Sequence, residues 1–178
     1  MSAWIGPAII AAILSSIVTV IGWMVAHERD RRTEITRRRE RIRDYQTALR
    51  AEIRSHRARL ARLDLSEHSI LIATKIEESR GEYTPFVPRE SHPSIYNAVL
   101  SDIHILPAQV IDPVVLYYTQ LRSLSEFAED LRSEQFQTLG PERKSEMYRD
   151  YIGLTAYAVE LADGALASIN LSLDGDRQ

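Results

Sequence analysis

Cysteine is missing from this 178-residue sequence, and glycine and proline occur only seven times each. The lack of cysteine excludes thiolate metal ligands and agrees with a reducing compartment. The sequence contains no glycine-rich phosphate loop, no Gly-x-Ser-x-Gly motif and no His-Glu-x-x-His pair. Its five histidines are scattered, and none belongs to a Glu-x-x-His pair of the di-metal type. We therefore expect no metal, no cofactor and no enzyme activity.

Charged side chains are also missing from the first 26 residues, whereas the next 17 residues contain eight arginines. Trp4 to Ala26 is an apolar run that, as a helix, is long enough to cross a hydrocarbon core of about 30 Å. Trp4 and Trp23 lie near its ends, where indole rings favour the headgroup level. A cleaved signal peptide needs basic residues before the run, and these are missing. The pattern predicts a transmembrane anchor over residues 1–28.

The arginines after the run predict the orientation of this anchor, because positively charged flanks stay in the cytoplasm. We expect a bacterial inner-membrane protein with its N-terminus outside and residues 27–178 in the cytoplasm. Anionic lipid headgroups are the expected partners of the tryptophans and of the nearest arginines. These residues are Trp4, Trp23, Arg29, Arg31, Arg32, Arg37, Arg38 and Arg39.

One face of the predicted anchor carries only small or weakly polar side chains, at alternating steps of four and three residues. Small residues let helices approach closely in lipid, so this stripe predicts self-association of the span. The alternative is that the stripe only reflects an alanine-rich composition. A pore is a further hypothesis, although the span offers only hydroxyl groups to line one. The stripe consists of Ala8, Ala12, Ser15, Thr19, Gly22 and Ala26.

The formal net charge of −3 combines two regions of opposite sign. Residues 27–63 carry 13 arginines and six acidic residues, whereas residues 64–178 carry nine basic and 19 acidic residues. We expect a lipid-facing collar followed by a basic helix that pairs with acidic helices of the same domain or of a neighbour. Twenty of the 22 basic residues are arginine, which suits forked pairing with carboxylate or phosphate. Nucleic acid is not an expected partner, because the acidic part would repel it.

Five of the six positions spaced seven residues apart from Ile35 to Ile70 are apolar, with His56 as the exception, and they predict a long amphipathic helix directly after the anchor. Two interpretations of its end are open. The helix stops near residue 63 and a capping box of Asp64 and Glu67 starts another, or one helix continues to about residue 79. The stripe with its intervening positions consists of Ile35, Ile42, Tyr45, Gln46, Leu49, Ile53, His56, Leu60, Leu63 and Ile70.

Three prolines and a glycine end the helical pattern between residues 79 and 94. A short helix over about 93–103 is expected to follow. Asp112 and Pro113 have the pattern of an N-cap and an N1 proline, which predicts a helix from there to about residue 138. Its expected apolar face consists of Leu116, Leu121, Leu124, Phe127, Ala128 and Leu131.

A last helix is predicted over about 142–171, after the Gly140-Pro141 turn, with a flexible tail over 174–178. Its expected inward residues are Met147, Tyr151, Leu154, Ala158, Leu161, Ala165 and Ile169. No alternating strand pattern occurs, so the predicted fold class is all-α. The transmembrane helix continues into the basic helix, which packs in a cytoplasmic bundle of about four helices over residues 29–173.

The proline-rich stretch is long for a connection between bundle helices, and long loops often carry function. It either binds a protein partner or only crosses one end of the bundle. The candidate partner residues are Pro85, Phe86, Pro88, Arg89 and His92. Tyrosines either line a ligand pocket or are core rings whose hydroxyls reach the surface. The tyrosines concerned are Tyr96, Tyr117, Tyr118, Tyr148, Tyr151 and Tyr157.

Two Arg-x5-His spacings fit the motif of the HEPN ribonucleases: Arg50 with His56, and Arg62 with His68. In that class His56 would transfer protons and Arg50 would stabilise the phosphorane. However, arginine is so frequent here that about as many matches are expected by chance. The alternative is that His56 is a partly buried residue of the apolar stripe.

The segment SIYNAVLSDIHILPAQVIDPVVLYYTQL, which follows Pro93, resembles a pattern in uncharacterised bacterial membrane-anchored helical proteins. In those proteins an Ile-Tyr segment, a Leu-Pro segment and a Tyr-Tyr helix follow an N-terminal span. The layout is also similar to the membrane-anchored accessory protein of type VI-B CRISPR systems, which has a HEPN-like domain and assembles into a pore. A late Arg/His pair, which that family's HEPN-like domain has, is absent from this sequence.

These patterns support three functional hypotheses. The first is a non-enzymatic inner-membrane protein that forms a homo-oligomer through its span and binds a protein partner. The second is a pore or membrane-disrupting effector of a defence system, as the CRISPR resemblance implies. The third is a membrane-tethered HEPN-like ribonuclease that uses Arg50, His56, Arg62 and His68.

Overall fold

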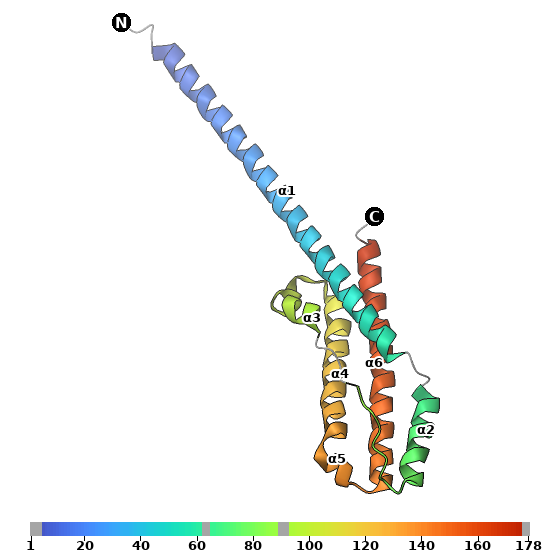
Figure 1. The fold of residues 1–178 in the computed structure, drawn as a ribbon. Helices are drawn as coiled ribbons and strands as arrows, with labels where there is room; N and C mark the ends of the chain where they lie inside the picture. The colour runs from blue at the N-terminus through green and yellow to red at the C-terminus, as the bar shows by residue number, and fades with distance from the viewer. Residues whose placement is uncertain (1–4, 62–64, 89–92, 176–178) are drawn as a thin grey trace. The chain divides into compact units, whose positions relative to one another are not determined.

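Every element that the structure describes is helical (Figure 1), which confirms the predicted all-α fold. The computed structural model describes residues 5–61, 65–88 and 93–175, and before residue 31 it describes the side chains of Trp23 and Met24 alone. The elements are α1 (Ile5–Leu60), α2 (Leu65–Glu78), α3 (Ser94–Val99), the 3-10 helix η1 (Leu100–Ile105), α4 (Ala108–Arg132), α5 (Glu134–Thr138) and α6 (Pro141–Gly175).

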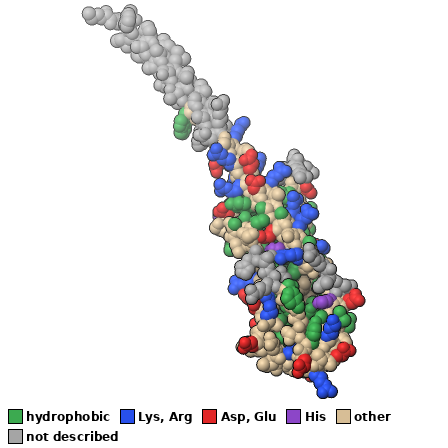
Figure 2. Space-filling view, in the orientation of Figure 1, with side chains coloured by type: hydrophobic (Ala, Val, Ile, Leu, Met, Phe, Trp, Pro, Cys, Tyr) green, Lys and Arg blue, Asp and Glu red, His purple; other side chains and the backbone are tan. Residues whose placement is uncertain are grey.

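The chain divides into two compact units, residues 1–43 and 44–178. Helix α1 contributes to both, because it runs from Ile5 to Leu60 without interruption. This confirms that the N-terminal apolar segment continues into the basic helix. In the first unit, all side chains of residues 31–41 are exposed. Blue basic and red acidic side chains intermingle just beyond the grey atoms in Figure 2, as on a solvated helix surface.

The second unit contains the hydrophobic core, in which the last part of α1 joins α2, α4 and α6. Helix α6 packs against both α2 and α4. Each of the four helices buries aliphatic side chains completely, among them Leu49 and Ile53 of α1, Ile76 of α2, Leu124 of α4 and Ile169 of α6. This is the predicted bundle of about four helices, and α3, η1 and α5 are short additions to it.

The break after α1 decides between the two predicted helix ends. Helix α1 ends at Leu60 and α2 begins at Leu65, so the single helix to residue 79 is wrong. Asp64 of the capping box lies outside the described residues. Helix α2 ends in a left-handed turn, where Arg80 has φ 54° and Gly81 has φ 89°. The Gly81 N–H bonds to the Ile76 carbonyl, which closes the helix end.

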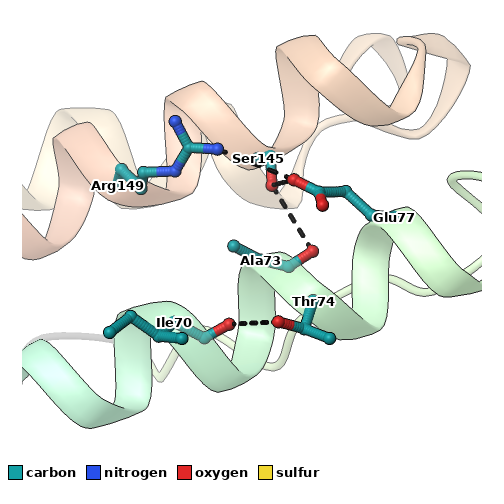
Figure 3. Close-up of polar contacts among 6 residues, drawn as sticks. All are labelled: Ile70, Ala73, Thr74, Glu77, Ser145 and Arg149. Atoms are coloured by element: carbon teal, nitrogen blue, oxygen red, sulfur yellow. Dashed lines mark hydrogen bonds and ion pairs between the residues drawn. The ribbon is translucent and has the colours of Figure 1, made fainter.

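Helix α2 is joined to α6 by polar contacts as well as by its apolar face (Figure 3). The fully buried Ser145 hydroxyl lies 3.5 Å from the Ala73 carbonyl and 3.4 Å from the Glu77 carboxylate. Arg149 lies 3.7 Å from the same carboxylate. Beside them the buried Lys144 ammonium donates to the Gly81 carbonyl at 2.6 Å. These bonds attach the turn after α2 to the start of α6.

The predicted start of this helix at Asp112 and Pro113 is wrong, because α4 begins at Ala108 and contains Pro113 in its interior. A proline there removes the hydrogen bond to the carbonyl four residues earlier, which belongs to Gln109. Ser168 of α6 donates its hydroxyl to that Gln109 carbonyl instead. Tertiary packing therefore compensates for the proline inside the helix.

The other boundaries differ from the prediction by smaller amounts. Helix α4 ends at Arg132, not near residue 138, because Ser133 accepts the Phe136 N–H and caps the separate helix α5. Helix α6 continues to Gly175, so the predicted tail from residue 174 begins inside it. The short helix expected over 93–103 is present as α3 followed by η1.

Some residues of the predicted apolar faces are exposed. Ile70 is 70% exposed, because α2 is a separate helix whose buried face consists of Ile72, Ala73 and Ile76. Leu116 is 56% exposed because Tyr117, one residue later, takes the inward position in α4. Ile35 is 44% exposed in the first unit. Phe127, Met147, Leu154 and Leu161 are half-buried, and the other described core candidates of α4 and α6 are buried.

Helix α6 is the one helix, among the residues searched, whose length and apolar composition would allow it to cross a membrane. The core helix of a bundle meets the same criteria, and α6 buries Lys144, Ser145 and Thr155 against its neighbours. We therefore assign α6 to the core of the second unit. The predicted anchor over Trp4–Ala26 lies outside the residues whose side chains are described, apart from Trp23 and Met24.

Candidate functional site

The most organised polar site in the second unit surrounds Glu52 on the inner face of α1, where this side chain is only 8% exposed. Its carboxylate accepts the backbone N–H groups of Ile95 at 2.8 Å and Tyr96 at 3.0 Å. The N-cap residue of α3, Pro93, offers no side-chain bond of its own. Glu52 thus caps α3 from a different helix and supplies the acceptor that the helix start needs.

A third donor to Glu52 comes from α4, since the Tyr118 hydroxyl lies 2.7 Å from the carboxylate. The Ser94 hydroxyl is a fourth donor, at 3.4 Å. Burial by itself would raise the pKa of Glu52, but the hydrogen bonds from Ile95, Tyr118 and Tyr96 and the nearby His56 outweigh burial and lower the pKa. The same contact raises the pKa of Tyr118, which burial raises most. Glu52 is therefore a carboxylate that joins α1, α3 and α4.

His56 lies one turn after Glu52 and is 5% exposed. Burial, followed by the charge of Arg59, lowers the pKa of His56, and Glu52 opposes this effect. The Nδ1 atom of His56 has no hydrogen-bond partner among the described residues. The neutral imidazole is consequently the form that this environment favours.

Tyr96 and Tyr118, which both donate a hydrogen bond to Glu52, form an aromatic stack. The rings of Tyr96 and Tyr118 are parallel within 13° at a centroid distance of 3.9 Å, and Tyr117 meets Tyr118 edge-on at 4.9 Å. Tyr96 and Tyr118 line a pocket of about 410 Å³ between α3 and α4. Glu52 does not line it, because its bonds are directed to the protein. We therefore assign Glu52 the role of holding α3 and Tyr118 in position beside this pocket.

A second pocket, of about 360 Å³, lies where α1, α2 and α6 meet the proline-rich stretch. Tyr148 and Tyr151 of α6 line it, and burial raises the pKa of Tyr148 to about 12. Phe86 and Pro88 form part of its wall. Tyr148 and Tyr151 are therefore buried residues that also line a pocket, whereas Tyr157 is 50% exposed, and the ligand-binding interpretation stays a prediction.

The proline-rich stretch presents one aromatic side chain to solvent. Pro85 and Val87 are buried, whereas Phe86 between them is 86% exposed. This alternation is that of an extended segment with one face on the bundle. Pro88 is exposed as well, and Arg89 and His92 lie outside the described residues. We call residues 85–88 the proline segment.

The structure separates the candidate ribonuclease residues. Arg50 donates to Asn170 of α6 at 3.2 Å, on the surface, whereas His56 is buried beside Glu52. Six residues along a helix correspond to about 120° of rotation, so the two side chains lie on different faces. His68 lines the second pocket and its ring lies 6.2 Å from that of Tyr148. Arg62 lies outside the described residues.

The predicted membrane-contact residues are only partly described. Trp23 is 72% exposed, and Arg31, Arg32 and Arg37 to Arg39 are exposed. The side chains of Trp4, Arg29 and the small-residue stripe lie outside the described residues, so their roles stay predictions. Within residues 5–61, 65–88 and 93–175, no group of three His, Asp or Glu side chains has the arrangement of a metal site.

Sequence reasoning missed Glu52, the residue with the largest number of inter-helix bonds at this site. A signal was present, since an acidic residue lies beside Leu49 and Ile53 on the apolar stripe and four residues before His56. Carboxylates in such positions are buried only where donors meet them. The donors come from residues more than 40 positions away, which the periodicity of α1 does not reveal.

Comparison with known proteins gives no indication of the function, which is therefore argued from the residues described above. No protein-family model matches the chain, and no curated protein or solved structure is significantly similar to it.

Proposed function

We propose that the protein is a single-pass bacterial inner-membrane protein whose cytoplasmic bundle binds a protein partner through the proline segment. The anchor is the uncharged run from Trp4 to Ala26, which from Ile5 onward belongs to the uninterrupted helix α1. The exposed arginines from Arg31 to Arg39 suit contact with anionic headgroups on the cytoplasmic side. The small-residue stripe supports self-association of the span.

The observation that carries partner binding is the exposure of Phe86 beside an apolar pocket. An aromatic side chain contributes about 1.5–3 kcal/mol when it leaves water, and such residues dominate protein interfaces. Buried Pro85 and Val87 hold the segment in place, so little conformational entropy is lost when a partner binds. The expected occupant of the second pocket is an apolar side chain of the partner, flanked by Phe86 and Pro88.

Photo-crosslinking in cells tests this surface. Benzoylphenylalanine at position 86 is expected to give a defined crosslinked species, whereas the same group at the exposed Thr84 gives none or much less. Purified Phe86→Ala protein should retain its unfolding midpoint, because the ring contributes little to the core. Equal crosslinking at both positions would show that Phe86 is an ordinary surface residue.

Membrane insertion is tested separately. Full-length protein is expected to remain in the pellet after alkaline carbonate extraction, and protein lacking residues 1–28 to become soluble. External protease on spheroplasts should leave the C-terminal part intact, and its digestion would reverse the orientation. The mass in nanodiscs measures self-association of the span. If the full-length protein and the protein lacking residues 1–28 are both monomers, the small-residue stripe only reflects an alanine-rich composition.

The pore, antiviral-defence and ribonuclease hypotheses are not preferred, because no contact among the described residues supports them. The likeness to membrane-anchored helical proteins and to the CRISPR accessory family is likewise a hypothesis that no contact among the described residues supports. Leakage from protein-containing vesicles would favour the pore, and unchanged cellular activity after replacement of His56 and His68 would eliminate the ribonuclease.

A further inference from the structure

An open groove of about 700 Å³ lies along the contact between the last part of α1 and α6. Arg50, Arg54 and Arg57 line it from α1 at steps of four and three residues, which place them on one face of the helix. Asn170 lines it from α6. We call this feature the arginine groove, and it is separate from the tyrosine pockets and the proline segment.

The surrounding side chains fix two of these arginines. Arg57 forms two hydrogen bonds with the Asp163 carboxylate of α6, and their charges compensate each other. Arg50 donates to the Asn170 side-chain oxygen at 3.2 Å, which orients the guanidinium but leaves its charge unpaired. Arg54 has no hydrogen bond or ion pair with any residue that the structure describes. The arginine groove therefore has an excess of two positive charges.

This excess is unusual for the second unit. Residues 44–178, which form this unit, carry 21 acidic and 14 basic side chains, so carboxylates outnumber basic groups in it. If the three arginines served only to attach α1 to α6, each would be expected to meet a carboxylate, as Arg57 does. Arg50 meets a neutral amide instead. The uncompensated charge is left on the solvent side of a concave surface, where an anion can reach it.

We propose that the arginine groove binds a small ligand through a phosphate or pyrophosphate group. Arg50 and Arg54 are one helical turn apart, so their forked donors can hold two oxygens of the same group. A phosphate with two negative charges matches the excess charge better than a single carboxylate does. The Asn170 amide and the Ser55 hydroxyl, which also line the groove, supply neutral donors for the remaining oxygens.

The test uses full-length protein in nanodiscs of uncharged lipid, with inorganic pyrophosphate as the probe and its phosphorus-31 linewidth as the readout. Wild-type protein is expected to broaden the signal, and an increase in salt should weaken the effect because the contact is ionic. Arg50→Gln and Arg54→Gln should each weaken binding about tenfold, the loss of one charge-assisted hydrogen bond. Arg143→Gln is the matched control, since Arg143 is an exposed arginine paired with Glu146.

Asn170→Asp provides a second test that leaves α1 unchanged. It is nearly isosteric and places a negative charge in the arginine groove, so pyrophosphate binding should be lost while the unfolding midpoint is retained. No broadening by the wild type, or equal loss in Arg143→Gln, overturns the proposal. Binding that survives both Arg54→Gln and Asn170→Asp overturns it as well.

The source of the phosphate is decided by a further arm with phosphatidic acid in the nanodisc. If the lipid abolishes pyrophosphate broadening by the wild type, the arginine groove holds a lipid headgroup. If broadening is unchanged, the ligand is a soluble phosphate ester. Neither result depends on the partner surface at Phe86, so this proposal and the proposed function fail independently.

Discussion

The two parts of α1 have similar arginine-rich sequences and very different surroundings. From residue 31 to 41 every side chain is exposed, whereas from Gln46 to Leu60 every third or fourth side chain is buried. The same seven-residue stripe runs through both, yet Ile35 is 44% exposed and Leu49 is fully buried. Periodicity in a long helix therefore shows which face is apolar, and the neighbouring elements decide where that face is covered.

The largest effect expected from this comparison concerns Glu52. In Glu52→Leu the N–H groups of Ile95 and Tyr96 and the hydroxyl of Tyr118 lose their acceptor, which should lower the free energy of unfolding by about 4 kcal/mol. The matched control is Glu34→Leu, an exposed acidic residue in the first part of the same helix. Urea unfolding followed by circular dichroism measures both. A change below about 1 kcal/mol in Glu52→Leu would contradict the role of the buried carboxylate.

A second pair compares equivalent positions on the apolar stripe. Leu49→Ala should lower the free energy of unfolding by about 3 kcal/mol, because it leaves a cavity in a closed core. Ile35→Ala should change it by less than about 1 kcal/mol, since the side chain is already partly in water. Equal losses at both positions would show that the first part of α1 is covered in solution, for example by a second copy.

The pH dependence of stability is the next effect. The folded protein lowers the pKa of His56 from 6.5, so the unfolded chain binds a proton first and stability falls as the pH drops below about 6.5. The lowered pKa of Glu52, whose usual value is 4.5, adds a further loss below about pH 4.5. Each group contributes at most about 1.4 kcal/mol per pH unit.

Unfolding midpoints between pH 7 and pH 5 in wild type and His56→Gln isolate the first step. The variant should lose part of the pH dependence, whereas His104→Gln, at an exposed histidine, should retain it. A curve for His56→Gln that parallels the wild type would mean that His56 titrates alike in the folded and unfolded states.

The smallest effect is expected at the surface arginines. Arg57→Ala removes a two-fold hydrogen bond to Asp163 that is open to solvent, so the unfolding midpoint should fall slightly at low salt. The difference should vanish near 1 M salt, where the Debye length is about 3 Å. Arg38→Ala, in the exposed part of α1, should have no effect at either salt concentration. A persistent effect of Arg57→Ala at high salt would indicate a packing role for its stem.

Features that depend on local chemistry were predictable from the sequence. The helical class, the break near Gly81 and the stripe through Leu49, Ile53 and Leu60 follow from glycine, proline and apolar spacing. The start of α4 was not predictable in this way. Pro113 has the pattern of a first-turn proline, and the bond from Ser168 to the Gln109 carbonyl, 59 residues apart, satisfies the acceptor that an interior proline leaves free.

The candidate sites were less predictable for the same reason. The proline segment was found because prolines mark an unusual connection, but the sequence does not show that Phe86 points outward while Val87 is buried. The arginine groove requires Arg50, Arg54 and Asn170 to meet across two helices. Spacing along one helix identified Arg50 and His56 as a pair, and the structure places them on different faces.

The Glu52 cap makes the start of α3 depend on the position of α1 along its axis. Three bonds of 2.7 to 3.0 Å end on one carboxylate, and a slide of α1 by a single residue would displace that carboxylate by about 1.5 Å. Hydrogen bonds do not survive such an extension. A displacement of α1 along its axis would therefore uncap α3.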